Sequence, residues 1–368
     1  MTEATDPDGS TDALDRLYGE AAALVRACRY DEAAAAYRSV LSWLCDYDAL
    51  VGLARVMEHQ NELDAASELY RQASAIVPGM ARPFTRRAML EARRLWGPPP
   101  SRRIPASPGR PRLSMTTLGQ NGRFGNQIFQ YGFLRLYADL HGLELELPDW
   151  LGRDLFGCDE PYPTVTLPET HEKAVNLIDS LPPGSTGRVA DIDLWGFCQY
   201  PTARLAPWRE HWCGQLRWAA PVARQLERWL QPLELADRTL VAVHIRRGDF
   251  SGERFWRSPT DWYLSWLRAL WPNLRRPLLY VASDDPSVVE DFRAFRPVTV
   301  ADAGQLPGAM AFLADFELLR RAEFLAISNS SFSVAAAMLS EDGRDFLRPV
   351  RAHDRLERFD PWNTAVLL

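Results

Sequence analysis

The sequence has few of the features that direct a chain to nucleic acid, to a membrane or to secretion. Only one of its 368 residues is a lysine, and the net charge is -6, so no basic field exists to hold a polyanion. No apolar run approaches the roughly 18 residues of a membrane span. The start of the chain is acidic, unlike a signal peptide. We therefore expect no nucleic-acid partner and no transmembrane segment.

Cysteine is also scarce. The chain has five cysteines, with no CxxC pair and no metal-ligand spacing: Cys28, Cys45, Cys158, Cys198 and Cys213. An odd, scattered set favours reduced thiols, so the sequence predicts a cytoplasmic protein without a metal site. Because Lys173 is the only lysine, any phosphate clamp has to be built from arginine.

The first hundred residues contain an internal repeat. Four positions recur 33 residues later: Tyr30, Asp31, Ala33 and Tyr37 as Leu63, Asp64, Ala66 and Tyr70. Small residues at a helix crossing, followed by an aromatic residue, resemble the tetratricopeptide repeat. We expect helices near 12–28, 31–44, 48–60, 63–76 and 81–96 in an all-α domain, 1–97. A generic alanine-rich bundle is the alternative, and a concave repeat surface would suit a protein partner.

A proline-rich stretch follows, with six prolines in the fifteen residues from Gly97 to Pro111. Neither a helix nor a central strand tolerates this density of proline. The sequence predicts an extended linker over 98–111.

From residue 112 onward, short apolar runs alternate with helical stretches. The predicted strands are 113–117, 194–197, 240–245, 278–282, 298–300 and 324–327, and the predicted helices are 125–141, 219–231, 260–271, 286–294, 310–321 and 332–340. This alternation is typical of βαβ units. It predicts an α/β region of two doubly wound, Rossmann-like lobes, 112–215 and 216–368, with ligands bound at the carboxyl ends of strands.

The first polar junction is Gly122–Tyr131, which follows a strand and opens a long helix. Gly122 and Gly125 allow the backbone to come close to a ligand, and the free N–H groups of a helix start favour an anion. The glycine pattern is weak evidence alone, because tight turns of this kind are common.

The second junction, Leu240–Phe250, is more specific. A buried strand leads directly into His244, Arg246, Arg247 and Asp249. One guanidinium can bind a diphosphate with two hydrogen bonds while the other pairs with Asp249 or a neighbouring loop. A structural salt bridge is the alternative.

Two more strands end in polar residues. In Leu279–Asp285, the hydroxyl of Ser283 precedes two carboxylates, which can accept from a guanine edge or cap the next helix. Capping suits Asp285 better than Asp284. In Phe324–Ser333, capping uses one or two of the hydroxyls, and the others indicate a phosphate cradle.

Together these stretches resemble the α-1,2-fucosyltransferase family and, more broadly, the GDP-fucose-dependent superfamily that includes α-1,6- and protein O-fucosyltransferases. The resemblance covers residues 112–365, and its His-x-Arg-Arg-Gly-Asp element, His244–Asp249, is highly specific. Gly196–Tyr200 is similar to the family's Gly-Tyr-Phe-Gln element.

The resemblance implies a GT-B fold and an inverting glycosyltransferase of carbohydrate metabolism that uses GDP-fucose and needs no metal or other cofactor. It assigns Arg246 to the β-phosphate, where it would stabilise the leaving group, and Gly125 and Asn126 to the diphosphate. Arg246 and Asn126 are thus the predicted catalytic residues. His244 and Asp284 would contact the guanine. The predicted donor-binding set also includes Gly122, Arg247, Asp249, Ser283, Ser330, Ser331 and Phe332.

Two departures from the family pattern leave the acceptor open. Val334, Ala335 and Ala336 stand where the family usually has two tryptophans, and the helical repeats are an addition. We expect the acceptor to be a hydroxyl of a glycan, a glycopeptide or a natural product. The alternatives are transfer of another GDP-hexose and a non-catalytic repeat adaptor that binds a nucleotide sugar.

Overall fold

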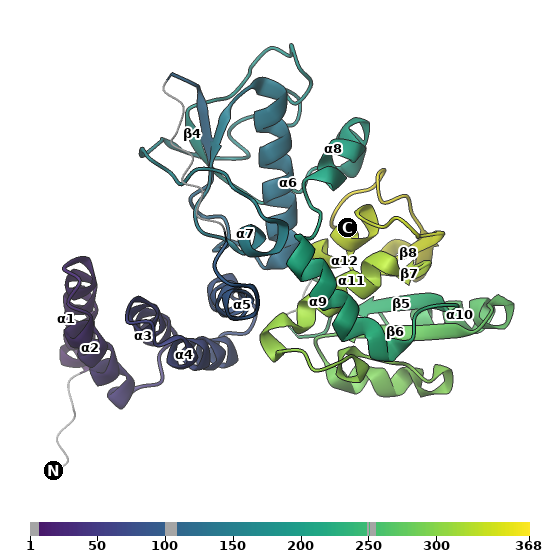
Figure 1. The fold of residues 1–368 in the computed structure, drawn as a ribbon, viewed down its shortest axis with the longest axis horizontal. Helices are drawn as coiled ribbons and strands as arrows, with labels where there is room; N and C mark the ends of the chain where they lie inside the picture. The colour runs from purple at the N-terminus through teal and green to yellow at the C-terminus, as the bar shows by residue number, and fades with distance from the viewer. Residues whose placement is uncertain (1–6, 100–108, 249, 251–254) are drawn as a thin grey trace. The chain divides into compact units, whose positions relative to one another are not determined.

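The computed structural model describes residues 7–99, 109–248, 250 and 255–368 (Figure 1). The chain divides into two compact units, Met1–Leu90 and Glu91–Leu368. The division falls within one helix, and each unit is described by itself below. Most of the predicted linker, 100–108, and the predicted donor residue Asp249 lie outside the described residues.

The described N-terminal residues form five packed helices: α1 (Pro7–Arg26), α2 (Tyr30–Trp43), α3 (Tyr47–His59), α4 (Leu63–Ile76) and α5 (Ala81–Trp96). These helices match the five predicted ones, although α1 begins earlier than expected. Their antiparallel hairpins are consistent with tetratricopeptide-like repeats. Binding of a protein partner by this unit stays a prediction.

Small residues allow these helices to approach closely. Ala33 and Ala66, the repeated alanines, are fully buried in the core of the first unit. Gly52 on α3 faces Tyr37 on α2, and a Cβ at Gly52 would lie 2.4 Å from the tyrosine ring. The buried Tyr70 hydroxyl donates to Glu58, which also pairs with Arg86. The repeat thus places small residues where helices cross.

The first lobe of the second unit is built on a parallel sheet. Its strands are β1 (Arg112–Ser114), β2 (Glu144–Glu146), β3 (Glu169–His171) and β4 (Ile192–Trp195), in the order β2-β1-β4-β3. The long helix α6 (Phe124–His141) follows β1, and α7 (Leu151–Phe156) follows β2. Most residues of α6 are buried, including the polar side chains of Gln127 and Gln130.

The second lobe holds a second sheet, in the order β6-β5-β7-β8-β9. Its strands are β5 (Thr239–Ile245), β6 (Pro277–Ser283), β7 (Phe324–Ala326), β8 (Asp345–Val350) and β9 (Arg355–Arg358). Only β9 of these strands runs antiparallel to its neighbour. Helix α8 (Arg209–Gly214) packs on α6 of the first lobe. The helices of the second lobe are α9 (Ala220–Leu230), α10 (Thr260–Leu270), α11 (Ala311–Arg321) and α12 (Ser331–Met338). The fold is therefore two mainly parallel, GT-B-like lobes, preceded by helices.

The structure corrects the predicted elements at two places. Residues 298–300 do not form a strand, because only Val298 bridges to Tyr280 and Val300 begins a 3₁₀ turn. Thr299 and Asp302 close that turn as a capping box. Residues Pro286–Phe295 form a 3₁₀ rather than an α-helix. Strands β2, β3, β8 and β9 were not predicted.

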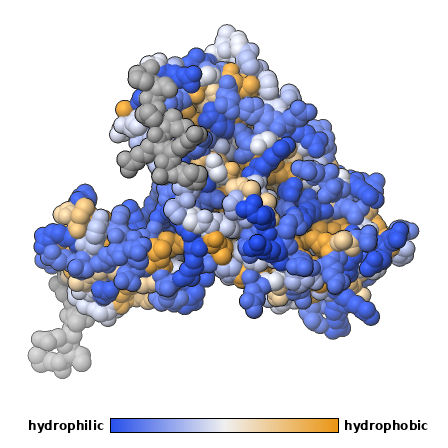
Figure 2. Space-filling model, viewed as in Figure 1, coloured by the Kyte–Doolittle hydropathy of each residue, from blue (hydrophilic) through white to orange (hydrophobic). Residues whose placement is uncertain are grey.

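The molecular surface is mostly polar, with small and separate hydrophobic patches on the visible face (Figure 2). Exposed large hydrophobic residues of the described chain include Trp43, Val165 and Phe255. Among the described helices, none combines the length and hydrophobicity that a membrane span requires.

The helix crossing at Gly52 gives a testable prediction. Gly52→Ala is expected to lower the free energy of unfolding by about 1–3 kcal/mol, because the new methyl group overpacks against Tyr37. Gly19→Ala on α1 is the matched control: nothing lies within 4 Å of a Cβ there, and a gain of about 0.5–1 kcal/mol is expected. Urea unfolding followed by circular dichroism measures the stability of both variants. An equal effect of the two substitutions would contradict the close approach of α2 and α3 at Gly52.

Candidate functional site

The register of the second sheet brings two of the predicted motifs together. Ile245, the last residue of β5, lies opposite Ser283, the last residue of β6. One residue further on, Arg246 and Asp284 form an ion pair, with 3.0 Å between Nη1 and Oδ2. Because both strands are parallel and end here, this pair stands at the ligand-binding edge of the sheet.

Asp284 also holds the backbone of the arginine loop. Its Oδ1 accepts from the Arg247 N–H at 2.7 Å, and its Oδ2 accepts from the Gly248 N–H at 3.1 Å. The carboxylate thus fixes the loop as well as the Arg246 guanidinium. Asp249, which the sequence analysis offered as a partner for one of the arginines, lies outside the described residues. Guanine contact by Asp284 stays a prediction.

The other residues of these two junctions have structural partners. Arg247 donates to the Thr260 hydroxyl and to the Arg246 carbonyl, so its guanidinium binds the start of α10. The Ser283 hydroxyl accepts from the Asp285 N–H. Asp285 caps the helix that follows, since it accepts from the Ser287 N–H at 3.0 Å. The preference for Asp285 as the capping residue is confirmed.

His244 connects the arginine junction to the serine-rich junction. Its side chain is buried, its Nδ1 lies 3.0 Å from the Ser328 hydroxyl, and its ring lies 5.4 Å from that of Phe332. Burial, with the positive charges of Arg246 and Arg123, lowers the pKa of His244 to about 3. The imidazole is therefore neutral at physiological pH and offers hydrogen bonds rather than charge.

Each polar side chain of the stretch Ser328–Ser333 has a partner within the protein. Ser328 lies against His244, Asn329 exchanges two hydrogen bonds with the backbone of Leu368, Ser330 caps α12, Ser331 donates to Asn126, and Ser333 donates to the Ser330 carbonyl. The hydroxyls are thus already hydrogen-bonded in this structure. A phosphate-binding role for Ser330, Ser331 and Phe332 stays a prediction.

The two lobes meet where helices α6 and α12 begin. The Asn126 Oδ1 accepts from the Ser331 hydroxyl at 2.6 Å and from the Gln199 side chain at 2.7 Å. A Cβ at Gly125 would lie 2.5 Å from the Phe332 nitrogen, so only glycine allows this approach. Gly122 has a φ of 88° and lies under the Asn126 side chain. The glycines here serve the contact between lobes.

A turn after β4 joins the same region. Gln130 on α6 donates to the carbonyls of Asn121 and Gly196, so the glycine loop and the turn are tied together. The Glu172 carboxylate accepts from the backbone N–H groups of Phe197 and Cys198. The sequence drew attention to Gly196–Tyr200, but no sequence signal indicated Glu172.

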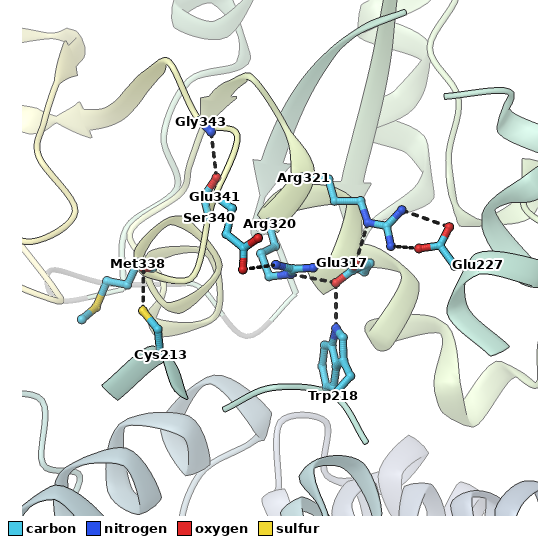
Figure 3. Close-up of polar contacts among 10 residues, drawn as sticks. All are labelled: Cys213, Trp218, Glu227, Glu317, Arg320, Arg321, Met338, Ser340, Glu341 and Gly343. Carbon is cyan, nitrogen blue, oxygen red and sulfur yellow. Dashed lines mark hydrogen bonds and ion pairs between the residues drawn. The ribbon is translucent and has the colours of Figure 1, made fainter. Parts of the chain in front are cut away.

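The connection between the lobes is anchored on the second lobe by a buried carboxylate (Figure 3). The Trp218 indole donates to Glu317 on α11 at 2.8 Å, and Arg320 and Arg321 pair with the same carboxylate. Burial alone would raise the pKa of Glu317, but the Arg320 hydrogen bond and the neighbouring charges outweigh it and hold the pKa below its usual value. Cys213 also contacts the Met338 carbonyl across the same connection.

Aromatic rings fill the space around this connection. Phe124 at the start of α6 lies 5.2 Å from Phe316, 6.3 Å from Trp218 and 6.5 Å from Phe332, measured between ring centroids. The cluster joins residues from both lobes and explains why Phe124 is buried. Phe332 therefore packs as part of the core that joins the lobes.

Within the part of the chain that the structure describes, no three histidine, cysteine, aspartate or glutamate side chains gather as a metal-binding group. The five cysteines are free. Metal independence stays a prediction.

The buried His244 makes stability depend on pH. Below its ordinary pKa of 6.5 the unfolded histidine takes up a proton, while the folded one stays neutral down to about pH 3. Stability is therefore lost as the pH falls. Between pH 7 and pH 5 the free energy of unfolding of the wild type should fall by about 2 kcal/mol more than that of His244→Gln.

Urea unfolding of both proteins across this pH range measures the difference. If the free energy of unfolding changes with pH in the same way for the wild type and for His244→Gln, the histidine is not held neutral in the folded protein.

Comparison with known proteins gives one match by sequence. The chain is 26% identical over 262 residues to galactoside 2-alpha-L-fucosyltransferase SEC1 of Bos taurus. The match takes in 62% of this chain and 66% of that protein, slightly under two thirds of its length. No protein-family model matches the chain.

Solved structures give weaker matches. A NodZ fucosyltransferase from Bradyrhizobium is 12% identical, with a TM-score of 0.46, over 68% of this chain and 99% of that one. A NodZ α-1,6-fucosyltransferase soaked with GDP-fucose has a TM-score of 0.44 at 12% identity, with the same coverage of both chains. An O-GlcNAc transferase mutant from Thermobaculum terrenum has a TM-score of 0.24 at 13% identity, over 94% of this chain and 51% of that one. On the sequence match, the chain is similar to glycosyltransferases of the fucosyltransferase kind, as a distant homologue of an α-1,2-fucosyltransferase.

Proposed function

We propose that the chain is a fucosyltransferase that moves fucose from GDP-fucose to a hydroxyl group of an acceptor, with inversion and without a metal ion. One observation carries this proposal: direct contacts link the four sequence motifs into a single site. Arg246 pairs with Asp284, His244 packs on Phe332, and Asn126 accepts from Ser331. The sequence similarity to an α-1,2-fucosyltransferase supports the same donor.

In this proposal Arg246 supplies the positive charge for the departing GDP. The guanidinium is held by Asp284 at the end of β5, so it needs little reorganisation when negative charge develops on the β-phosphate. Arg246 also lies over the Phe250 ring, at 5.3 Å from its centroid, which limits its other orientations. His244 stays neutral and serves as a hydrogen-bonding group beside this charge.

Asn126 is a residue of the first lobe that contacts the serine-rich junction. Its side-chain oxygen accepts from Ser331 and Gln199, which ties the start of α6 to the serine-rich junction, while its amide nitrogen lies against Gly122. No general base is assigned. In this mechanism the rate acceleration comes mainly from stabilisation of the leaving group. The alternative is that the donor is another GDP-hexose, and the competition experiment below distinguishes the two donors.

Nucleotide binding tests the donor assignment. The wild type is expected to bind GDP more tightly than UDP or ADP in calorimetry, with the same affinity in the presence of EDTA. Equal affinities for the three nucleotides would refute the guanine site, and loss of binding in EDTA would refute metal independence. Competition by GDP-fucose and GDP-mannose against GDP then distinguishes the two donor sugars.

Arg246→Ala tests the catalytic assignment. Removing a charge that acts on the leaving group should lower kcat/KM for transfer by about 10²–10³-fold. Arg293→Ala is the control, since Arg293 is exposed and pairs only with the exposed Glu290 among described residues. Unchanged transfer by Arg246→Ala, with normal folding, would contradict the mechanism.

Asp284→Asn tests whether the carboxylate positions Arg246. The variant keeps the size of the side chain but removes the ion pair, so we expect transfer to fall by about tenfold or more while the protein stays folded. Asp285→Asn next to it loses only part of a helix cap and should cost about 1 kcal/mol of stability or less. Similar transfer by both variants would remove Asp284 from the mechanism.

A further inference from the structure

The turn after β4, Gly196–Tyr200, packs around a carboxylate. Glu172 follows β3 directly, and its backbone N–H donates to the Trp195 carbonyl at 2.8 Å, so the pairing of β3 with β4 continues one residue beyond the strand. A Cβ at Gly196 would lie 2.5 Å from Cδ of Glu172. The carboxyl group therefore occupies the space that a side chain at position 196 would fill.

Two successive N–H groups of the turn bind this carboxylate. Phe197 donates to Oε1 of Glu172 at 3.1 Å, and Cys198 donates to Oε2 at 2.8 Å. Cys198 has a φ of 53°, in the left-handed region that residues other than glycine seldom adopt. Successive N–H groups that converge in this way form a nest, which is a concave site for an anion. Here the anion in the nest is a side chain of the protein itself.

The left-handed backbone at Cys198 needs an interaction that offsets its cost. Such a conformation is unfavourable for a residue with a Cβ, and it persists where the surrounding structure holds it. The Cys198 side chain is buried, and burial together with the negative charge of Glu172 raises the pKa of its thiol. The thiol therefore stays protonated, and the charge that holds the turn is that of Glu172.

The conformation of this turn decides where the Gln199 side chain lies. Gln199 follows Cys198, and its side-chain nitrogen donates to Oδ1 of Asn126 at 2.7 Å. The Ser331 hydroxyl of the second lobe donates to the same oxygen at 2.6 Å. These two donors determine the orientation of the Asn126 amide, because a flipped amide would present its own donor nitrogen to both of them.

A further side chain ties the turn to the loop before α6. The buried Gln130 donates to the Gly196 carbonyl at 2.8 Å and to the Asn121 carbonyl at 3.0 Å. The turn thus contacts the start of α6 twice, once through Gln130 and once through Gln199. A carboxylate that fixes the turn therefore acts on Asn126 along directly bonded neighbours.

From these contacts we propose that Glu172 is a positioning residue of the transferase site. Its carboxylate holds the turn in the conformation that directs Gln199 to Asn126, and it thereby fixes the orientation of the Asn126 amide at the junction with the second lobe. Glu172 needs no contact with substrate for this role. The proposal rests on the proposed function, because the site that it completes is the one that contains Asn126.

A double-mutant cycle tests whether Glu172 acts through Asn126. Glu172→Gln keeps the shape of the side chain but replaces one acceptor oxygen by a donor, so one N–H of the turn loses its partner. We expect this variant to lower kcat for transfer from GDP-fucose about tenfold. In an Asn126→Ala background the same substitution should change kcat by less than about twofold, because the amide that Glu172 positions is then absent. A tenfold loss in both backgrounds would overturn the proposal.

Glu169 provides the matched control. It lies on the same strand as the residue before Glu172, and its side chain is exposed. Glu169→Gln removes the same charge without touching the turn, so kcat should stay within about twofold of the wild type. A loss as large as that of Glu172→Gln would assign the effect to charge in this lobe and would contradict the positioning role.

Gly196→Ala reaches the nest from the other side. Its methyl group would displace the Glu172 carboxylate, so this variant should also lower kcat, and adding Glu172→Gln should lower kcat no further. Wild-type transfer by Gly196→Ala, or a full additional loss in the double variant, would overturn the proposal even if Glu172→Gln alone folds poorly.

An NMR measurement tests the same coupling without turnover. Isotope-labelled asparagine side chains give separate NH₂ signals, and the Asn126 signals are identified by their absence in Asn126→Ala. Glu172→Gln should shift these signals, because the amide loses its fixed orientation, and Glu169→Gln should leave them in place. Unshifted Asn126 signals in folded Glu172→Gln would overturn the proposal.

The two proposals fail in different ways. If calorimetry finds no preference for GDP while Glu172→Gln still shifts the Asn126 signals, the proposed function fails and the positioning of Asn126 by Glu172 stands. If GDP is preferred and transfer occurs but the Asn126 signals do not respond to Glu172→Gln, the positioning role fails alone.

Discussion

The close approach of helices α6 and α12 is the constraint on which the site depends. A Cβ at Gly125 would lie 2.5 Å from the backbone of Phe332, and the next residue, Asn126, bonds to Ser331. Because of this approach, the glycine loop of one lobe and the serine-rich junction of the other form one surface. The aromatic cluster around Phe124 supports the contact from behind.

Two carboxylates organise charge in this part of the structure, the partly exposed Asp284 and the buried Glu317. Asp284 holds the loop of Arg246 by two backbone N–H groups and an ion pair. Glu317 plays a similar part for the connection between the lobes, where Trp218, Arg320 and Arg321 surround it. In both places a carboxylate with several hydrogen-bond partners fixes a neighbouring segment, and at Glu317 these partners make a buried charge compatible with a stable fold.

The sequence predicted the order of helices and strands better than it predicted which residues contact one another. The helices of the first unit were predicted from the internal repeat. The strand that holds His244, and the strands that end just before Asp284 and Ser328, were predicted from short apolar runs, because such runs report on burial. Strands β2 and β3 were missed because each has three residues and mixed polarity. The 3₁₀ turn at Val300 replaced a predicted strand, since the capping box of Thr299 and Asp302 is a local interaction that an apolar run does not reveal. Contacts such as Asp284 with the arginine loop join residues far apart in sequence, and no local pattern contains them.

The serine-rich junction has a consequence for the energetics of any anion that binds there. Since each polar side chain from Ser328 to Ser333 already has a partner in the protein, an incoming phosphate exchanges hydrogen bonds rather than adding them. The net gain in binding free energy then comes mainly from the positive electrostatic potential of Arg246 and its neighbours. Affinity that arises from such a potential weakens as ionic strength rises, so the salt concentration, more than the number of hydroxyls, would set how tightly an anion is held there.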